Sequence, residues 1–339
     1  QPFPEFRLYG VNRRLYPVSA RDGDGRDVLA KVLKSDKEHP DDFKRTEGGA
    51  AEMHSLELDF GAVAKDNKGL MVLHGWVDWA DGSTFLAASQ EFREGMVPPY
   101  LQVKNSAGEW ETVIDDMGMP DGKPKTISVD LSGKFLSAER KVRIVTNLCV
   151  YWDEIFLSES NDWPDHEQFS IGLLSAEARF HGFSANKVHP LRKQPEQFFY
   201  EDSSPISLWN PTPGRYTRYG AVHRLLDEVD DRFVVMGSGD EIRLLFEAPE
   251  KAPKAGWKRD FLLKVDGWAK DRDANTAFSQ SIEPLPFHGM TSYPYPAGEG
   301  PPDSPSYRRY RDEYNTRPAL RLIRSLVDDR TQSDRTAAP

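Results

Sequence analysis

The sequence predicts a mainly β protein made of two related antiparallel β-sandwich units, jelly-roll-like in type, with a few short helices. Three observations carry this prediction. Apolar and polar residues alternate in several runs, turn-forming dipeptides that contain glycine separate the runs, and a tryptophan-containing motif occurs twice in the 339 residues. Because no helical crossover pattern lies between the runs, antiparallel sheets are favoured over a parallel sheet.

The composition is that of a folded chain with a polar surface. Lys and Arg number 44 and Asp and Glu number 54, which gives a net charge of −10, while 11% of the residues are aromatic. That aromatic content is too high for a disordered chain, and no run of 18 apolar residues offers a transmembrane segment. The acidic balance argues against nucleic acid as a partner, because phosphate contacts need a basic face.

Residues 1–52 are expected to form a loop and helix segment that packs on the first sandwich. Glycines and aspartates at 21–27 favour turns, and the apolar residues at 28–33 recur at helical spacing behind Asp27, which is placed as the helix N-cap. The stretch 38–50 is rich in Pro, Asp, Lys and Gly, so it predicts a connecting loop.

Residues 53–158 are expected to form the first sandwich unit. A period of two at 56–60, 127–131 and 142–152 predicts half-buried antiparallel strands. The single cysteine, Cys149, lies among apolar neighbours in the last of these runs. We interpret it as a core thiol, and one cysteine excludes an intramolecular disulfide.

Residues 159–219 are expected to be an aromatic- and Pro-rich connecting segment without regular structure. The second β-rich unit follows over 220–290, with a helix at about 220–230 and strands at 242–246 and 261–265.

The last region, 291–339, is expected to hold a Pro-rich loop, short helices and a disordered tail. One helix is placed at about 304–314. A second is placed from Pro318 through Val327, with the proline in the first helical turn.

An internal repeat is the most informative feature of the chain. The residues that match without a gap are Gly75 with Gly267, Trp76 with Trp268, Asp81 with Asp273, and Thr84 with Thr276. The apolar runs upstream, 71–73 and 263–265, also correspond. Since Trp is a rare residue, these matches predict two copies of one β-rich unit.

Two interpretations of this motif stay open. In the structural one, the glycine permits a bulge or close backbone approach, the indole fills the core, and Asp and Thr bond the amides of their own turn. In the other, the motif is a ligand platform for a sugar ring. The residues of that platform would be Trp76, Trp79, Asp81, Trp268 and Asp273.

Asp271, Asp273 and Asn275 place oxygen ligands at alternate positions, a spacing that lets three side chains converge on Ca²⁺. The glycine and the bidentate glutamate of a complete calcium loop are missing, since Ile282 holds the twelfth position. A solvated turn is the alternative. No other cofactor is expected.

Catalytic signatures are absent from the sequence, which has no Gly-x-Ser-x-Gly elbow, no phosphate-binding P-loop and no dinucleotide fingerprint. His288, in a Pro-rich aromatic loop at 284–290, is the histidine that best suits general acid or base work. The structural alternative is a histidine bonded to loop backbone.

Six stretches resemble a C-terminal module of large bacterial proteins that carry FG-GAP (VCBS), ASPIC/UnbV-type and tetratricopeptide segments. They are Leu15–Asp22, Gly75–Thr84, Tyr151–Ile155, Tyr216–Gly220, Asp266–Asp271 and Pro284–Met290. The resemblance implies export from a bacterial cell, to the periplasm or the cell exterior, and it implies no catalytic residue. Separately, the pattern at Trp152–Ile155 is similar to that of jelly-roll carbohydrate-binding modules.

Together these features predict a non-catalytic exported module that serves as an interaction or extrinsic structural subunit of a larger bacterial envelope assembly, with other protein subunits as partners. A carbohydrate-binding module, stabilised by calcium and with a glycan as partner, is the first alternative. A hydrolase that uses carboxylates and His288 is the second.

Overall fold

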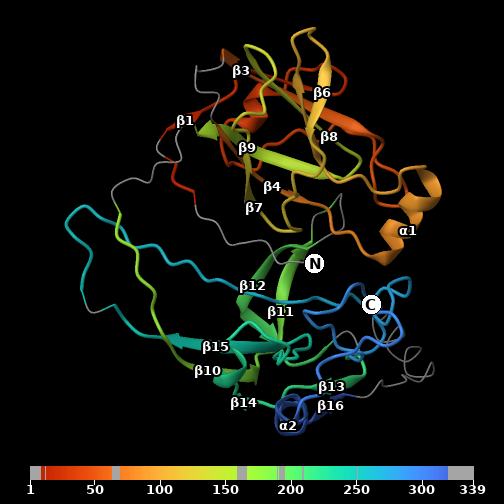
Figure 1. The fold of residues 1–339 in the computed structure, drawn as a ribbon, viewed down its shortest axis with the longest axis vertical. Helices are drawn as coiled ribbons and strands as arrows, with labels where there is room; N and C mark the ends of the chain where they lie inside the picture. The colour runs from red at the N-terminus through yellow and green to blue at the C-terminus, as the bar shows by residue number, and fades with distance from the viewer. Residues whose placement is uncertain are drawn as a thin grey trace, which may run out of the picture. The chain divides into compact units, whose positions relative to one another are not determined.

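The structure, a computed structural model, is mainly β with antiparallel sheets, as predicted (Figure 1). It divides into two compact units, of which unit 2 lies within residues 5–168 and 188–196 and unit 1 holds most of the remainder. The residues that the structure describes are 9–11, 13–62, 69–158, 166–188, 190, 195–207, 210–249 and 251–319.

Unit 2 contains two sheets in which every neighbouring pair of strands is antiparallel. The five-stranded sheet has the order β2 (Ser19–Asp22), β3 (His54–Ala62), β8 (Glu139–Thr146), β5 (Tyr100–Lys104) and β6 (Trp110–Ile114). The four-stranded sheet has the order β1 (Arg14–Leu15), β9 (Val150–Ser158), β4 (Leu70–Val77) and β7 (Lys125–Asp130).

Both sheets contribute to one buried core. Leu58 and Val142 project into it from the five-stranded sheet, and Met71 and Leu157 project into it from the four-stranded sheet. The alternation in the sequence marks these inward positions, because successive side chains of a strand point to opposite faces. Burial of such apolar surface supplies the main driving force for folding of this unit.

The predicted run 142–152 is two strands rather than one. β8 ends at Thr146 and β9 begins at Val150, and the buried Asn147 lies between them. The Asn147 side chain accepts a hydrogen bond from the Val97 amide at 2.7 Å and donates one to the Gly95 carbonyl at 2.8 Å. Bonds from a polar side chain to neighbouring loop backbone replace the sheet ladder here, which is why the alternation alone was misleading.

Helical structure in unit 2 also differs from prediction. The segment 28–33 forms only a short 3-10 helix, η1 (Leu29–Val32), although Asp27 accepts the Leu29 amide hydrogen bond as a cap would. A helix that was not predicted, α1 (Gly82–Glu91), follows β4. Its N-cap is Asp81, whose carboxylate accepts bonds from the amide and hydroxyl of Thr84 at 3.0 Å.

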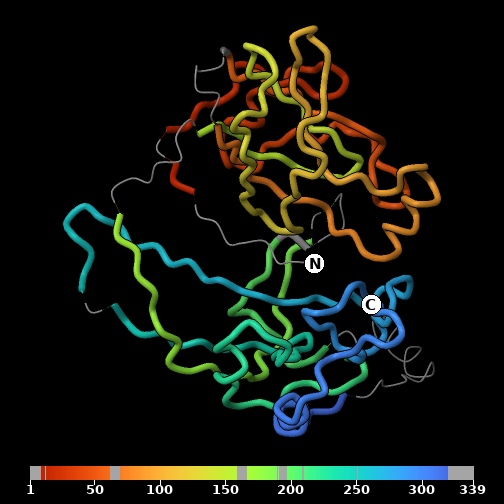
Figure 2. The backbone as a smooth tube through the Cα atoms, in the orientation of Figure 1, coloured from red at the N-terminus to blue at the C-terminus, as the bar shows by residue number. Residues whose placement is uncertain are grey.

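Among the described residues, unit 1 is built from smaller sheets, one α-helix and one short 3-10 helix. Its three-stranded sheet has the order β14 (Gly220–Ala221), β10 (Leu173–Phe180) and β15 (Asp240–Phe246), and two-stranded sheets pair β11 (Phe183–Val188) with β12 (Pro195–Ser204) and β13 (Gly214–Tyr216) with β16 (Arg317–Ala319). Figure 2 traces these segments along the chain.

Helix α2 (Pro305–Tyr314) confirms the prediction of a helix at about 304–314. Ser304 caps it by accepting the Tyr307 amide at 3.1 Å, and Pro305 lies in the first turn. Tyr307, Tyr310 and Tyr314 lie on one face of the helix and pack in a buried cluster with alanines of β10.

Several predictions for unit 1 are wrong. The region 159–219 holds β10 to β13 rather than irregular chain, because the inward positions of β10 are the small residues Ala176 and Ala178, which hide its apolar period. The helix at 220–230 is only the 3-10 helix η2 (His223–Leu225). Pro318 lies in β16, and the rest of the predicted last helix and tail lies outside the described residues.

The two copies of the repeat motif adopt different structures. Gly75 lies in β4 where the register with β9 shifts, and a Cβ at this position would collide with the Tyr151 carbonyl oxygen. Trp76 is 9% exposed and stacks on Tyr151, so the structural interpretation holds for this copy. In the second copy 261–265 is not a strand, Gly267 faces open space and Trp268 is 46% exposed, so the prediction of an equivalent second unit is wrong.

We expect Gly75→Ala to destabilise unit 2 by about 3 kcal/mol, because the added methyl group forces apart two strands that approach closely. Gly267→Ala is the matched control and should change stability by less than about 0.5 kcal/mol. Urea unfolding followed by circular dichroism measures both. Equal effects of the two substitutions would contradict the different roles assigned to the two glycines.

Candidate functional site

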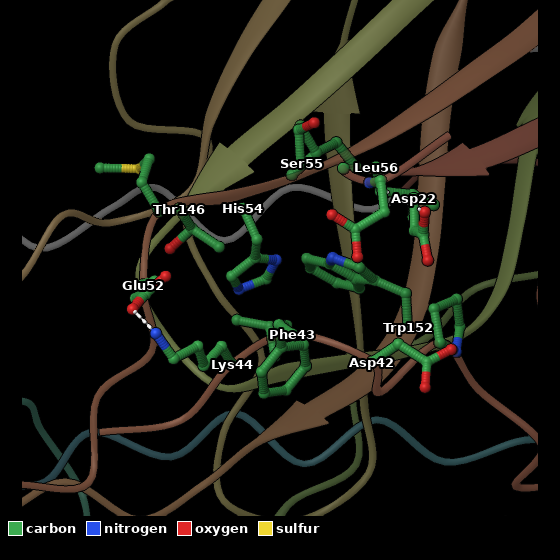
Figure 3. Close-up of a pocket in the computed structure, with 16 residues that line it drawn as sticks. Asp22, Asp42, Phe43, Lys44, Glu52, His54, Ser55, Leu56, Thr146 and Trp152 are labelled. Carbon is green, nitrogen blue, oxygen red and sulfur yellow. Dashed lines mark hydrogen bonds and ion pairs between the residues drawn. The ribbon is translucent and has the colours of Figure 1, made fainter. Parts of the chain in front are cut away.

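A cleft of about 280 Å³ opens at one end of the five-stranded sheet of unit 2 (Figure 3). It forms where β2 ends, β3 begins and β8 ends. The register pairs Asp22 with Leu56 and His54 with Thr146, so antiparallel pairing alone brings these side chains to one place. Trp152 reaches the cleft from β9 of the other sheet.

Aromatic rings form the walls of the cleft. Figure 3 shows the His54 imidazole next to the Trp152 indole, with Phe43 on another side of His54. The Phe43 and His54 rings are stacked with centroids 4.6 Å apart. His54 Nε2 lies 2.9 Å from the Leu148 carbonyl oxygen, which accepts a hydrogen bond from it, and burial lowers the pKa of the imidazole. A neutral flat ring is thereby presented to the cleft.

Carboxylates that pair with cationic side chains lie beside the aromatic walls. The Arg26 guanidinium lies 2.6 Å from Asp24, 3.3 Å from Asp22 and 3.5 Å from Asp42. Asp22 also accepts the backbone amides of Asp24 and Arg26. Glu52 is the fourth carboxylate of the lining, after Asp22, Asp24 and Asp42. It forms an ion pair with Lys44, the lysine of the lining, as Figure 3 shows. Such a lining disfavours anionic ligands.

Behind Phe43 the aromatic contacts continue into the protein. The Tyr151 hydroxyl donates a hydrogen bond to Asp78 at 3.0 Å and accepts one from Arg45, and burial followed by the Asp78 charge raises the pKa of Tyr151. Cys149 lies in the same buried cluster, where burial raises the pKa of its thiol to about 12. The interpretation of Cys149 as a core thiol is confirmed.

The structure places the predicted platform residues of unit 2 in different environments. Trp76 is in the core, and Asp81 is used as the cap of α1. Trp79 is 46% exposed, its indole N–H donates to the Gly122 carbonyl at 3.1 Å, and its ring lies against the Gly122 backbone. Of these three side chains only Trp79 presents a ring face to solvent.

The predicted calcium ligands of unit 1 close a turn with local hydrogen bonds. Asp271 accepts the Thr276 hydroxyl at 3.0 Å, and Asp273 accepts the Asn275 amide at 2.7 Å. Within the described ranges no group of three or more His, Cys, Asp or Glu side chains is arranged to hold a metal ion. The solvated-turn alternative accounts for these contacts.

His288 is held by a carboxylate rather than by loop backbone. Its Nδ1 and its backbone amide both lie 2.7 Å from the Asp231 carboxylate, its Nε2 lies 3.6 Å from Asp266, and its ring stacks on Phe233. An aspartate on Nδ1 fixes the orientation of an imidazole, as in catalytic dyads, but it also cross-links two loops. The hydrolase alternative therefore stays a prediction.

Sequence reasoning missed the residues of the cleft, because Phe43, His54 and Trp152 are far apart in the chain and belong to no motif. The signal that could have found them is the pairing of predicted strands.

In comparisons with known proteins, no family model, curated protein or solved structure matches the chain. No helix of the described segments is both long and apolar enough to cross a bilayer.

We expect the stability of unit 2 to fall as the pH drops below about 6.5, the ordinary pKa of histidine, because the unfolded chain takes up a proton at His54 that the buried ring resists. Above that pH, the contribution of the neutral His54 ring to the stability of unit 2 is fully present. His54→Gln keeps an N–H donor for the Leu148 carbonyl but does not titrate. Urea unfolding at pH 7.5 and pH 5 should show a smaller pH-dependent loss in the variant, and an unchanged loss would exclude His54 as its source.

Proposed function

We propose that the chain is a non-catalytic interaction module of an exported bacterial protein, and that unit 2 binds a carbohydrate in its cleft. The observation that carries this proposal is a cleft lined by aromatic rings beside carboxylates that Arg26 bridges. Among the partners considered from the sequence, a glycan fits this cleft best.

A sugar ring has an apolar face of C–H groups and an edge of hydroxyl groups. The partly exposed rings of Phe43 and His54, which line the cleft, match the first, and the acceptor oxygens of Asp24 and Asp42 match the second. The cleft volume of about 280 Å³ is just below the usual range of ligand pockets, about 300–1,000 Å³. The cleft therefore suits one terminal sugar residue rather than a long chain.

The charge of the lining selects among sugars. Four carboxylates against two cations, Arg26 and Lys44, leave a net negative charge that disfavours uronates and sulfated sugars and favours neutral or amino sugars.

We also propose that the two sheets of unit 2 act together as a β-sandwich with jelly-roll-like connections, a scaffold that holds binding loops at its end. The single core shared by both sheets and the location of the cleft at strand ends support this arrangement. Binding residues are commonly found on loops positioned by such a rigid scaffold.

On a glycan array, the full chain should bind neutral or amino sugars and should not bind uronates or sulfated sugars. Phe43→Leu, which removes the ring face, and Asp42→Asn, which removes a charged acceptor, should each weaken binding at least about tenfold, or 1.4 kcal/mol, in a calorimetric titration.

Trp79→Ala is the matched control, because it removes an exposed indole of the same unit that does not line the cleft. It should leave the affinity unchanged. A blank array with correctly folded protein would refute the proposal. Loss of binding in Trp79→Ala, with binding kept in Phe43→Leu, would move the site to the Trp79 platform.

A further inference from the structure

Unit 1 carries a segment whose charge is opposite to that of the chain as a whole. Residues 251–265 contain Lys251, Lys254, Lys258, Arg259 and Lys264 against a single acid, Asp260, so the segment has a net charge of +4 in a chain of net charge −10. We name residues 251–265 the basic arm. The remainder of the chain carries −14, so its field and that of the arm are of opposite sign.

The basic arm is a loop that turns back on itself. Figure 2 shows the chain leaving β15, reversing direction and returning as an extended segment. The reversal is closed by a hydrogen bond from the Trp257 amide to the Lys254 carbonyl at 2.9 Å, with Gly256 at φ +80°. Arg259 donates across the arm to the Lys251 carbonyl, so both sides of the turn are tied together.

Large apolar side chains lie next to these charges and face solvent. Phe261 is 68% exposed and Leu262 is 66% exposed, and Leu263 and Val265 are exposed as well. At the turn the Lys254 ammonium lies over the Trp257 ring, 4.7 Å from its centroid. A continuous exposed run of this kind marks an interaction surface, because single exposed apolar residues are normal but clusters are not.

We propose that the basic arm docks on a membrane surface that carries anionic phospholipid headgroups, with the lysines over the headgroups and Trp257, Phe261 and Leu262 inserted at the boundary with the acyl chains. Lysines beside exposed aromatic and leucine side chains are the composition of segments that lie in this interface. Each basic residue near an anionic surface strengthens binding, and an indole is most stable at headgroup level.

Charge complementarity decides in favour of a membrane. A groove on a protein partner would cover the apolar residues but would leave the lysines to specific ion pairs, and a nucleic acid would match the lysines but not Phe261 and Leu262. An anionic bilayer matches both kinds of side chain. The negative remainder of the chain is repelled by the same surface, which orients the molecule with the arm toward the lipid.

The test is co-sedimentation of the full chain with vesicles of phosphatidylglycerol and phosphatidylcholine in equal parts, compared with vesicles of phosphatidylcholine alone. We expect at least about tenfold stronger binding to the anionic vesicles, reduced by added salt. Lys254→Glu with Lys258→Glu, and separately Phe261→Ser with Leu262→Ser, should each weaken this binding at least about tenfold.

Two matched controls lie outside the arm. One makes an equal change in net charge, and the other removes the same kind of side chain. Arg224→Glu with Arg309→Glu changes the charge equally, and Phe278→Ser removes another exposed aromatic ring of unit 1. Both should bind as the unmodified chain does. Lipids brominated on their acyl chains should quench part of the tryptophan fluorescence, and Trp257→Phe should abolish that part.

The proposal is overturned if the folded chain does not bind anionic vesicles, if the arm variants and the charge control lose binding equally, or if the chain binds without quenching of Trp257 fluorescence. Tighter binding to a DNA duplex than to vesicles would also overturn it and assign the arm to nucleic acid. Because the cleft variants leave the arm intact, failure here leaves the carbohydrate proposal untouched.

Discussion

The antiparallel pairing of β3 with β2 on one side and β8 on the other is the constraint on which unit 2 depends. Its register directs Leu56, Leu58 and Phe60 into the core, and a shift by one residue would turn all three outward. The same register places His54 opposite Thr146 and Leu56 opposite Asp22, at the end of the sheet where the cleft opens. The hydrophobic core and the proposed site therefore have one common cause, and a ligand can be held rigidly because core burial already fixes the strands that surround it.

The Gly-Trp motif illustrates how one local sequence can acquire two structures. In the first copy, the Tyr151 backbone approaches so closely that only glycine fits at position 75, and the Trp76 indole is covered by neighbouring rings. In the second copy, a Cβ at Gly267 would point into open space, and the Trp268 ring is half exposed. The residues are identical in both places, so the difference comes from what the rest of the chain supplies. A buried position requires a partner surface, and the motif does not encode that surface.

This difference also sets the limit of prediction from the sequence. Elements with a strong local signal were predicted well: the alternating strand around Leu58, and the helix that Ser304 caps and Pro305 begins. Elements whose sequence signal is weak, or is spread over distant segments, were not predicted. β10 has alanines at its inward positions, and the 142–152 run breaks at Asn147 because a side-chain amide bonds to a loop 50 residues away. The cleft was out of reach for the same reason, since its walls come from separate segments that only strand pairing joins.

Local charge and total charge lead to different conclusions about partners. The net charge of −10 argued against nucleic acid as a partner of the whole chain, yet a ligand responds mainly to groups within about one Debye length, roughly 8 Å at physiological salt. On that scale the cleft of unit 2 is acidic and the basic arm of unit 1 is strongly positive. A chain with such an uneven distribution can engage an uncharged glycan at one surface and an anionic bilayer at another without conflict. Its acidic excess repels an anionic bilayer elsewhere, so contact with lipid is confined to the arm, whose local charge overcomes that repulsion.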